Sequence, residues 1–296
     1  MKTAYLFPGQ GSQYPGMGKK LFDQYNLARD RFKKANEILG FDITKIMFGD
    51  DQEILKRTDV TQPSIYLHSV ILYEILKDKL TPSMVAGHSL GEFSAVVASG
   101  ALSYESGLEL VIIRANAMQK ACLDNEGKMA AVIGLDIKVV DEICRNTSGI
   151  VAVANYNSPG QVVITGEIKA VETASENLKT KGAKRVIPLP VNGAFHSPLM
   201  EIAKKELAIA VENIKFYEPE FPIYQNVSSN PSKSIDEIKS NLVQQLVSPV
   251  LWQHTIMNMH QEGASEFYEV GPKNVLTNLN KRILPNVQVK QAESLL

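Results

Sequence analysis

Apolar and polar positions in the first 125 residues follow two periods. Residues 3–7 (TAYLF) and 84–87 (MVAG) are short apolar runs, typical of buried strands. Between and after them, apolar side chains recur at helical spacing. Strands that alternate with helices in this way favour a mostly parallel sheet covered by helices. The helices that we predict here lie at 21–39, at 64–80 (opened by Pro63) and at 104–122.

The pattern changes between residues 127 and 190, where the order becomes strand, helix, strand, strand, helix, strand. This order is typical of a small antiparallel ferredoxin-like unit. A strand at 266–271 and a helix at 274–283 return to the earlier alternation. We therefore expect an α/β fold: a hydrolase-like large domain with a mostly parallel sheet, carrying an inserted ferredoxin-like α+β subdomain. The expected boundaries are 1–126 and 191–296 for the large catalytic domain and 127–190 for the subdomain.

Composition and charge exclude several classes of function. The 31 basic and 32 acidic residues leave a formal net charge of -1, so no overall field attracts nucleic acid or anionic lipid. No stretch reaches the roughly 18 apolar residues that a membrane span needs. Cys122 and Cys144 are too few for a disulfide framework and are expected to be buried, reduced thiols. We expect a cytoplasmic protein that binds neither nucleic acid nor a membrane.

The stretch VAGHSLGEFSAVVASG, residues 85–100, contains the first candidate for chemistry. A Gly-x-Ser-x-Gly pattern alone arises by chance in a chain this long with a probability of roughly 0.1. Here, however, a predicted strand ends at Gly87 and a predicted helix begins near Leu90. Such a strand-to-helix turn projects a serine hydroxyl above a sheet, which makes Ser89 a candidate nucleophile. The alternative is a tight turn whose serine caps the helix.

A serine nucleophile needs a base, because its hydroxyl reacts poorly at neutral pH until the proton is removed. His196, in VNGAFHSPLM, lies where the inserted unit returns to the large domain, just before a helix that Pro198 can open. It is the favoured base. The other histidines fit other roles. His68 is expected in the core, and the side chain of His88, next to the nucleophile, is expected to point away from it. His254 and His260 are expected at or near the surface.

Arg114 lies on an apolar stripe of the helix predicted at 104–122. A buried guanidinium needs an anion, because an unpaired charge is costly to bury. The functional interpretation is a clamp for a substrate carboxylate, which arginine binds through two parallel hydrogen bonds. The alternatives are an internal ion pair and a side chain that extends to the surface. The apolar neighbours three and four positions away are Leu110, Val111, Ala117 and Met118.

Five segments together resemble the malonyl-CoA:acyl carrier protein transacylase family. They occur in the family's order and cover nearly the whole chain. The segments are FPGQGSQYPGMG at the N-terminus, GHSLGE around Ser89, GAFHSPLM around His196, QLVSPVLW near 250 and YEVGPKNVLTNL near 270.

The resemblance implies a role for each matching position. Ser89 would be the acylated serine, His196 the general base and acid, and Arg114 the residue that binds the free carboxylate of the malonyl group. Two backbone N–H groups would form the oxyanion hole, and a backbone carbonyl would orient the histidine in place of an aspartate. These further positions are Gln10 and Leu90 for the oxyanion hole and Gln245 for the carbonyl.

The implied activity is transfer of malonyl from malonyl-CoA to the phosphopantetheine thiol of an acyl carrier protein, through a malonyl-serine ester. No metal or resident cofactor is implied, and we expect a monomer. The rival interpretation is an acyl hydrolase that clears acyl groups from carrier proteins. A nucleotide-binding module is disfavoured, because PGQGSQYPGMG lacks the spacing of a phosphate-binding loop.

Phe195, directly before His196, bears on selectivity and pathway. In polyketide synthase relatives, phenylalanine at this position accompanies a preference for malonyl over methylmalonyl, and the usual fatty acid form has a smaller residue. The resemblance therefore suggests malonyl transfer in a polyketide pathway, with fatty acid synthesis as the alternative. Because carrier proteins are usually acidic, five basic residues are candidate docking charges, or else scattered solvated side chains: Lys184, Arg185, Lys273, Lys281 and Arg282.

Overall fold

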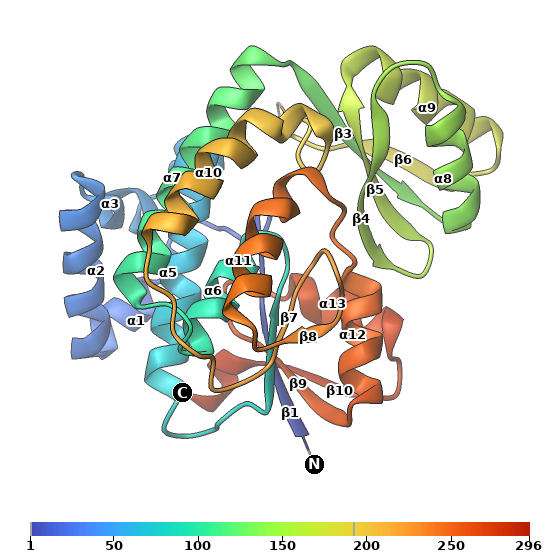
Figure 1. Cartoon of the computed structure of the whole chain (residues 1–296). Helices are drawn as coiled ribbons and strands as arrows, with labels where there is room; N and C mark the ends of the chain where they lie inside the picture. Colours follow the sequence, from blue (N-terminus) through green and yellow to red (C-terminus); the bar gives the residue numbers. More distant parts are fainter. Residues whose placement is uncertain (1, 192) are drawn as a thin grey trace.

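The computed structural model describes residues 2–191 and 193–296, which form two separate β-sheets with helices around them (Figure 1). The larger sheet has six strands in the order β10-β9-β1-β2-β7-β8, and all neighbours are parallel except β7 and β8. This mostly parallel sheet confirms the expected α/β class. Its strands are β1 (Lys2–Phe7), β2 (Met84–Gly87), β7 (Ile223–Tyr224), β8 (Pro231–Ser232), β9 (Ala264–Glu269) and β10 (Gln288–Gln291).

The smaller sheet has four strands in the order β4-β5-β3-β6, and every pair is antiparallel. Helices α8 (Ile137–Asn146) and α9 (Ile168–Thr180) pack against it, and the unit lies at the upper right in Figure 1. The strand order and connections are those of a ferredoxin-like unit, as the sequence predicts. Its strands are β3 (Gly127–Ile133), β4 (Val151–Ser158), β5 (Gln161–Glu167) and β6 (Arg185–Pro188).

Both faces of the larger sheet are covered, because successive side chains of a strand point to opposite sides. Tyr5 and Phe7 pack with the helices on one face, whereas Ala4 and Leu6 belong to a separate cluster with α12 and α13. The helices around this sheet are α1 (Lys19–Gln24), α2 (Asn26–Leu39), α3 (Ile43–Phe48), α4 (Gln52–Lys56), α5 (Thr58–Leu76), α6 (Gly91–Ala98), α7 (Tyr104–Asp124), α10 (Glu201–Asn213), α11 (Ile235–Gln244), α12 (Trp252–Gln261) and α13 (Val275–Ile283). Among the described residues, no helix has the length and apolar character needed to cross a membrane.

Two helix predictions were wrong in their bounds. The segment 21–39 forms α1 and α2, because the chain is extended at Tyr25, and the Arg29 guanidinium donates 2.9 Å hydrogen bonds to two carbonyls at the end of α1. Helix α5 begins at Thr58, so Pro63 lies inside the helix and does not open it. The polar residues before Pro63 hid this start, although Thr61 and Gln62 are buried.

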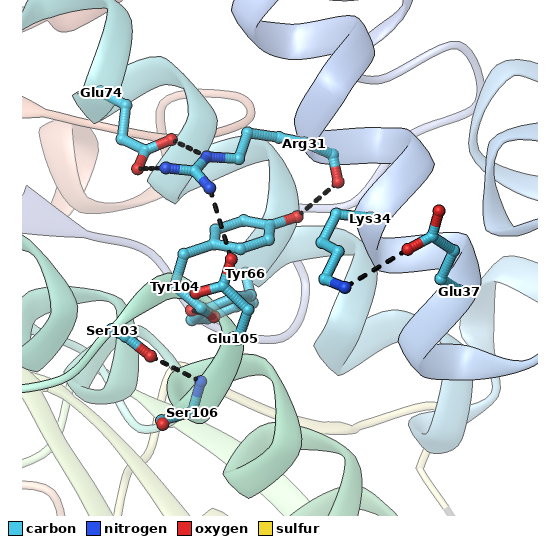
Figure 2. A network of polar contacts seen from close by, with 9 residues as sticks. All are labelled: Arg31, Lys34, Glu37, Tyr66, Glu74, Ser103, Tyr104, Glu105 and Ser106. Atoms are coloured by element: carbon cyan, nitrogen blue, oxygen red, sulfur yellow. Dashed lines mark hydrogen bonds and ion pairs between the residues drawn. The ribbon is translucent and has the colours of Figure 1, made fainter. Parts of the chain in front are cut away.

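A network around Arg31 joins three of the helices (Figure 2). Its guanidinium, on α2, makes two 2.7 Å hydrogen bonds to Glu74 on α5 and lies 3.4 Å from Glu105 on α7. The Tyr104 hydroxyl donates to the Arg31 carbonyl (2.9 Å), and the Tyr66 hydroxyl donates to the Tyr104 carbonyl (2.6 Å). These contacts fix α5 against α7, and both helices supply side chains to the polar cluster described next.

Candidate active site

Ser89 lies on a sharp corner between β2 and α6. Its φ of 52° is in the left-handed region, which non-glycine residues seldom adopt. The corner is also tightly packed, because a Cβ on Gly87 would lie 1.9 Å from the carbonyl carbon of Gly91. One on Gly91 would lie 2.0 Å from the Phe7 carbonyl oxygen. Glycine at both positions therefore allows the approach of backbone that presents the serine above the sheet.

His196 is within hydrogen-bonding distance of Ser89. Its Nε2 lies 2.8 Å from the Ser89 Oγ, and its Nδ1 lies 2.8 Å from the backbone carbonyl oxygen of Gln245. A carbonyl can only accept, so Nδ1 carries the proton and Nε2 is free to accept the proton of the serine hydroxyl. The histidine has φ 60° and is separated by Ser197 from a 3-10 turn that begins at Pro198. A serine, a base and an orienting acceptor are thus brought together.

The surroundings of His196 keep its imidazole neutral. Burial lowers its pKa from the usual 6.5 to about 3, and the positive charge of Arg114 acts in the same direction. The bond to the Gln245 carbonyl offsets part of this effect. A neutral imidazole is the form that can take a proton from serine.

Arg114 is a buried cation held by uncharged groups. Its side chain is almost fully buried, and it donates to the Gln62 Oε1 (2.7 Å), the Gln245 Oε1 (2.9 Å) and the Ser89 Oγ (3.0 Å). The guanidinium carbon also lies 5.5 Å from the centre of the Phe93 ring. Within residues 2–191 and 193–296 it forms no ion pair, so neither an internal salt bridge nor a surface-reaching side chain is observed.

Burial lowers the pKa of Arg114 to about 10, and the charge of Glu92 offsets part of that fall. The guanidinium therefore stays protonated at neutral pH. Glu92 is itself fully buried, and burial raises its pKa to about 7. A cation beside the serine, with no carboxylate in contact, is suited to bind an acidic group of a ligand.

A cavity of about 110 Å³ opens over these groups. Its lining includes Ser89, Arg114 and His196, together with Gln10, Leu90 and Phe195. In the described part of the chain, the backbone N–H groups of Gln10 and Leu90 have no hydrogen-bond acceptor, so they remain available to a ligand. A second cavity of about 480 Å³ shares Gln10, Leu189 and Val191 with the first and extends to Lys56 and Lys273. Together they are large enough for a small-molecule substrate.

The remaining histidines lie apart from the reacting pair. His68 is buried in α5 as expected, and its Nε2 lies 3.2 Å from the Glu293 Oε1 without the geometry of a hydrogen bond. The His88 Nε2 lies 2.8 Å from the Asn157 Oδ1, so its ring is turned to the small sheet. His254 and His260 are exposed on α12. No set of three or more metal-ligating side chains occurs in the ranges that the structure describes.

Sequence reasoning missed three buried polar residues that surround the site. Gln62 holds Arg114, and Glu92 and Asn226 lie beneath the serine corner. One signal was present: Glu92 is a charged residue in an otherwise apolar helical run, GEFSAVVA. Gln62 and Asn226 lie in segments where a polar residue does not stand out from its neighbours, so only their contacts identify them.

Comparison with known proteins agrees with this geometry. The family model described as acyl transferase domain matches residues 4–295, and the chain belongs to that family. Within it, the chain is 39% identical to a malonyl CoA-acyl carrier protein transacylase of Staphylococcus aureus strain MSSA476, over 99% of this chain and 96% of the relative. It is 40% identical to the transacylase of the same name from Haemophilus influenzae, covering 97% and 94%.

Two solved structures show the same fold. An acyl-carrier-protein S-malonyltransferase from Bartonella henselae has a TM-score of 0.96 at 40% identity, covering 99% of this chain and 95% of its own. The malonyl-transacylase of a type II PKS, solved in complex with its acyl-carrier protein, has a TM-score of 0.94 at 38% identity, covering 98% and 95%. The family resemblance and the two-part fold predicted from the sequence are confirmed.

The protonation state of His196 gives a direct test of the site. Because its pKa lies near 3, we expect the ring to stay neutral, protonated on Nδ1, as the pH falls from 8 to about 5. Nitrogen-15 NMR of histidine-labelled protein measures this, and the variant His196→Gln assigns the signal. Half-titration of that signal near the ordinary histidine value would contradict the expected effect of burial.

Proposed function

We propose that Ser89 carries a malonyl group from malonyl-CoA to the phosphopantetheine thiol of an acyl carrier protein. The observation that carries this proposal is the position of the Ser89 Oγ, 2.8 Å from a neutral histidine nitrogen and 3.0 Å from the guanidinium of Arg114, which has no carboxylate in contact. The names of the relatives support both substrates. The protein is an acyltransferase, and its reaction proceeds in two half-reactions.

In the first half-reaction, the His196 Nε2 takes the proton of the Ser89 hydroxyl as the oxygen attacks the thioester carbonyl. The oxyanion is bound by the backbone N–H groups of Gln10 and Leu90, and one such donor is typically worth about 2.7–4 kcal/mol. The tetrahedral intermediate then breaks its C–S bond. His196 returns the proton to the sulfur, coenzyme A leaves, and malonyl remains as a serine ester.

In the second half-reaction, the carrier-protein thiol gives its proton to His196 and its sulfur attacks the ester carbonyl. The C–O bond to Ser89 breaks, and His196 protonates the serine oxygen. The Gln245 carbonyl holds the Nδ1 proton throughout, which fixes the tautomer without an acidic residue. The cycle is ping-pong, and it needs no resident cofactor because the thiol arrives on the partner.

We further propose that Arg114 and Phe195 set the choice of acyl group. Arg114 binds the malonyl carboxylate through two hydrogen bonds, an interaction that acetyl and simple longer acyl groups lack. The Phe195 ring lines the same cavity and would meet the extra methyl of methylmalonyl. The larger cavity, which reaches Lys273, is the proposed place for the pantetheine arm that both substrates share.

We also propose the division of the chain into a catalytic domain, 1–126 and 191–296, and an inserted subdomain, 127–190. The second sheet, which begins at Gly127 and ends at Pro188, supports this division. A cytoplasmic site of action is proposed as well, since Cys122 and Cys144 are free, buried thiols whose pKa values burial raises.

Whether the transferred units enter a polyketide or a fatty acid pathway depends on the partner carrier protein.

The rival hydrolase would use the same serine and histidine, and it has no support among the relatives, which are transacylases. The deciding experiment loads purified enzyme with malonyl-CoA and adds carrier protein or buffer. We expect intact mass spectra to gain one malonyl group on Ser89, to lose it when carrier protein is added, and to keep it in buffer. Ser89→Ala should gain none. Rapid loss of the adduct to water would favour the hydrolase.

Removing the charge of Arg114 should change which acyl groups are transferred. For Arg114→Gln we expect malonyl transfer to fall by roughly 100-fold or more, with acetyl transfer reduced far less, because only malonyl uses the guanidinium. In the same assays, Phe195→Ala should raise methylmalonyl transfer relative to malonyl. Equal losses of malonyl and acetyl transfer in Arg114→Gln would rule out the clamp.

The docking residues predicted from the sequence are all exposed. Lys281 and Arg282 end helix α13, and Lys184 and Arg185 lie where β6 begins. Lys184 packs on Gly134, next to Gly160, and Arg282 bonds to Gln161 in the same β4–β5 turn region. We propose that these four residues, together with Lys273, which lines the larger cavity, form a basic rim that binds the carrier protein.

Charge reversal measures the role of this rim. For Lys281→Glu we expect the KM for carrier protein to rise several-fold at low salt, with loading from malonyl-CoA unchanged. Lys20→Glu, at an exposed lysine of α1, is the matched control. Equal effects of the two variants would exclude Lys281 as a docking residue.

A further inference from the structure

Two side-chain amides hold the backbone of the nucleophile. The Ser89 N–H donates to the Asn226 Oδ1 (2.7 Å), and the Ser89 carbonyl accepts from the Gln245 Nε2 (3.1 Å). Asn226 also donates from its Nδ2 to the carbonyl of Gly87 (2.6 Å). The planar amide of Asn226 therefore spans the corner, with one bond to the end of β2 and the other to the serine itself.

Asn226 is fixed in turn by Glu92. Its own backbone N–H donates to the Glu92 Oε2 (2.7 Å), and the Gln225 Nε2 donates to the Glu92 Oε1 (3.1 Å). The carbonyl of Asn226 accepts from the N–H of Leu251 (3.0 Å). Asn226, Glu92 and Gln225 are fully buried, so water cannot replace these bonds. Both oxygens of the Glu92 carboxyl accept hydrogen bonds, which favour its ionised form against the effect of burial.

These hydrogen bonds can hold the strained backbone conformation of Ser89. A serine at φ 52° is strained, and such a conformation persists only when the surroundings determine it. Relaxing Ser89 would rotate its Oγ away from the nitrogen of His196. The bond from the Ser89 N–H to Asn226 also occupies that donor, which leaves the next amide, that of Leu90, to face the oxyanion.

We propose that Asn226 is a positioning residue for acyl transfer, which holds Ser89 in its reactive conformation and is itself held by Glu92. This inference rests on the proposed role of Ser89 as the acylated residue. It assigns a function to three buried polar groups, Asn226, Glu92 and Gln225, none of which touches the acyl group. The same bonds explain why a helix as apolar as α6 contains a buried acid.

The test compares Asn226→Ala and Asn226→Asp with a matched control, Asn280→Ala. Asn280 is equally buried and accepts one bond from the Trp252 Nε1 (3.0 Å), but it contacts none of the reacting groups. The rate of malonyl-Ser89 formation is measured in single turnovers at several malonyl-CoA concentrations, and unfolding by urea is measured for each variant.

For Asn226→Ala we expect the maximal rate of acylation to fall by about 100-fold while the half-saturating concentration changes little, because orientation and not binding is lost. Asn226→Asp keeps the acceptor for the Ser89 N–H and loses the donor to Gly87, so its loss should be smaller. Asn280→Ala should lose comparable stability and keep its rate. Wild-type rates in both folded Asn226 variants, or an equal loss in Asn280→Ala, would overturn the proposal.

A probe that does not depend on malonyl separates this proposal from the function proposed above. Phenylmethylsulfonyl fluoride labels activated serines, and we expect both Asn226 variants to be labelled more slowly than wild type. As for acylation, Asn226→Ala should be slower than Asn226→Asp. If wild-type Ser89 is labelled but never acquires malonyl, the proposed function fails while the positioning role is still measured. If the sulfonyl fluoride labels all variants equally, the positioning role fails.

The role of Glu92 is tested by combining variants. Glu92→Gln places an N–H₂ group against donors and should slow acylation. Because Glu92 acts on Ser89 through the side chain of Asn226, the double variant should be no slower than Asn226→Ala alone. Losses that multiply would show that Glu92 acts by another route and would overturn its part in the proposal.

Discussion

The burial of one positive charge determines how the rest of the site is arranged. A guanidinium taken out of water is expensive unless its donors find acceptors, and the terminal nitrogens of Arg114 donate to neutral oxygens of Gln62, Gln245 and Ser89. Its Nε has no partner among the described residues. These partners come from α5, from the 3-10 turn after α11 and from the serine corner. Three separate parts of the chain must therefore meet at one side chain, and the helix packing around Arg31 helps to keep them there.

Gln245 has a central place in this arrangement, because one residue serves all three reacting groups. Its backbone carbonyl binds His196, its side-chain oxygen binds Arg114 and its side-chain nitrogen binds the Ser89 carbonyl. The positions of the nucleophile, the base and the cation therefore all depend on this one residue. The family resemblance implied the carbonyl contact, whereas the two side-chain contacts became visible only in three dimensions.

Much of the fold follows from local pattern, because buried strands and amphipathic helices leave periodic traces. The strand before Ser89 and the β-α-β-β-α-β order of the small unit were predicted correctly for that reason. The break at Tyr25 was missed because the apolar spacing continues across it, and the two-residue strands β7 and β8 are too short to have a period. Bonds such as that from Ser89 to Asn226 join residues 137 positions apart and leave no local trace.

The backbone carbonyl that orients His196 has an electrostatic consequence. A carboxylate in its place would stand among the same side chains as Arg114 and would compete for the guanidinium as an internal counterion. That carboxylate would also repel any anionic substrate that approaches Arg114. A dipole in the third position of the triad orients the imidazole at no such cost. The guanidinium of Arg114 therefore keeps a positive charge that no contacting carboxylate neutralises, available to the molecule that enters the pocket.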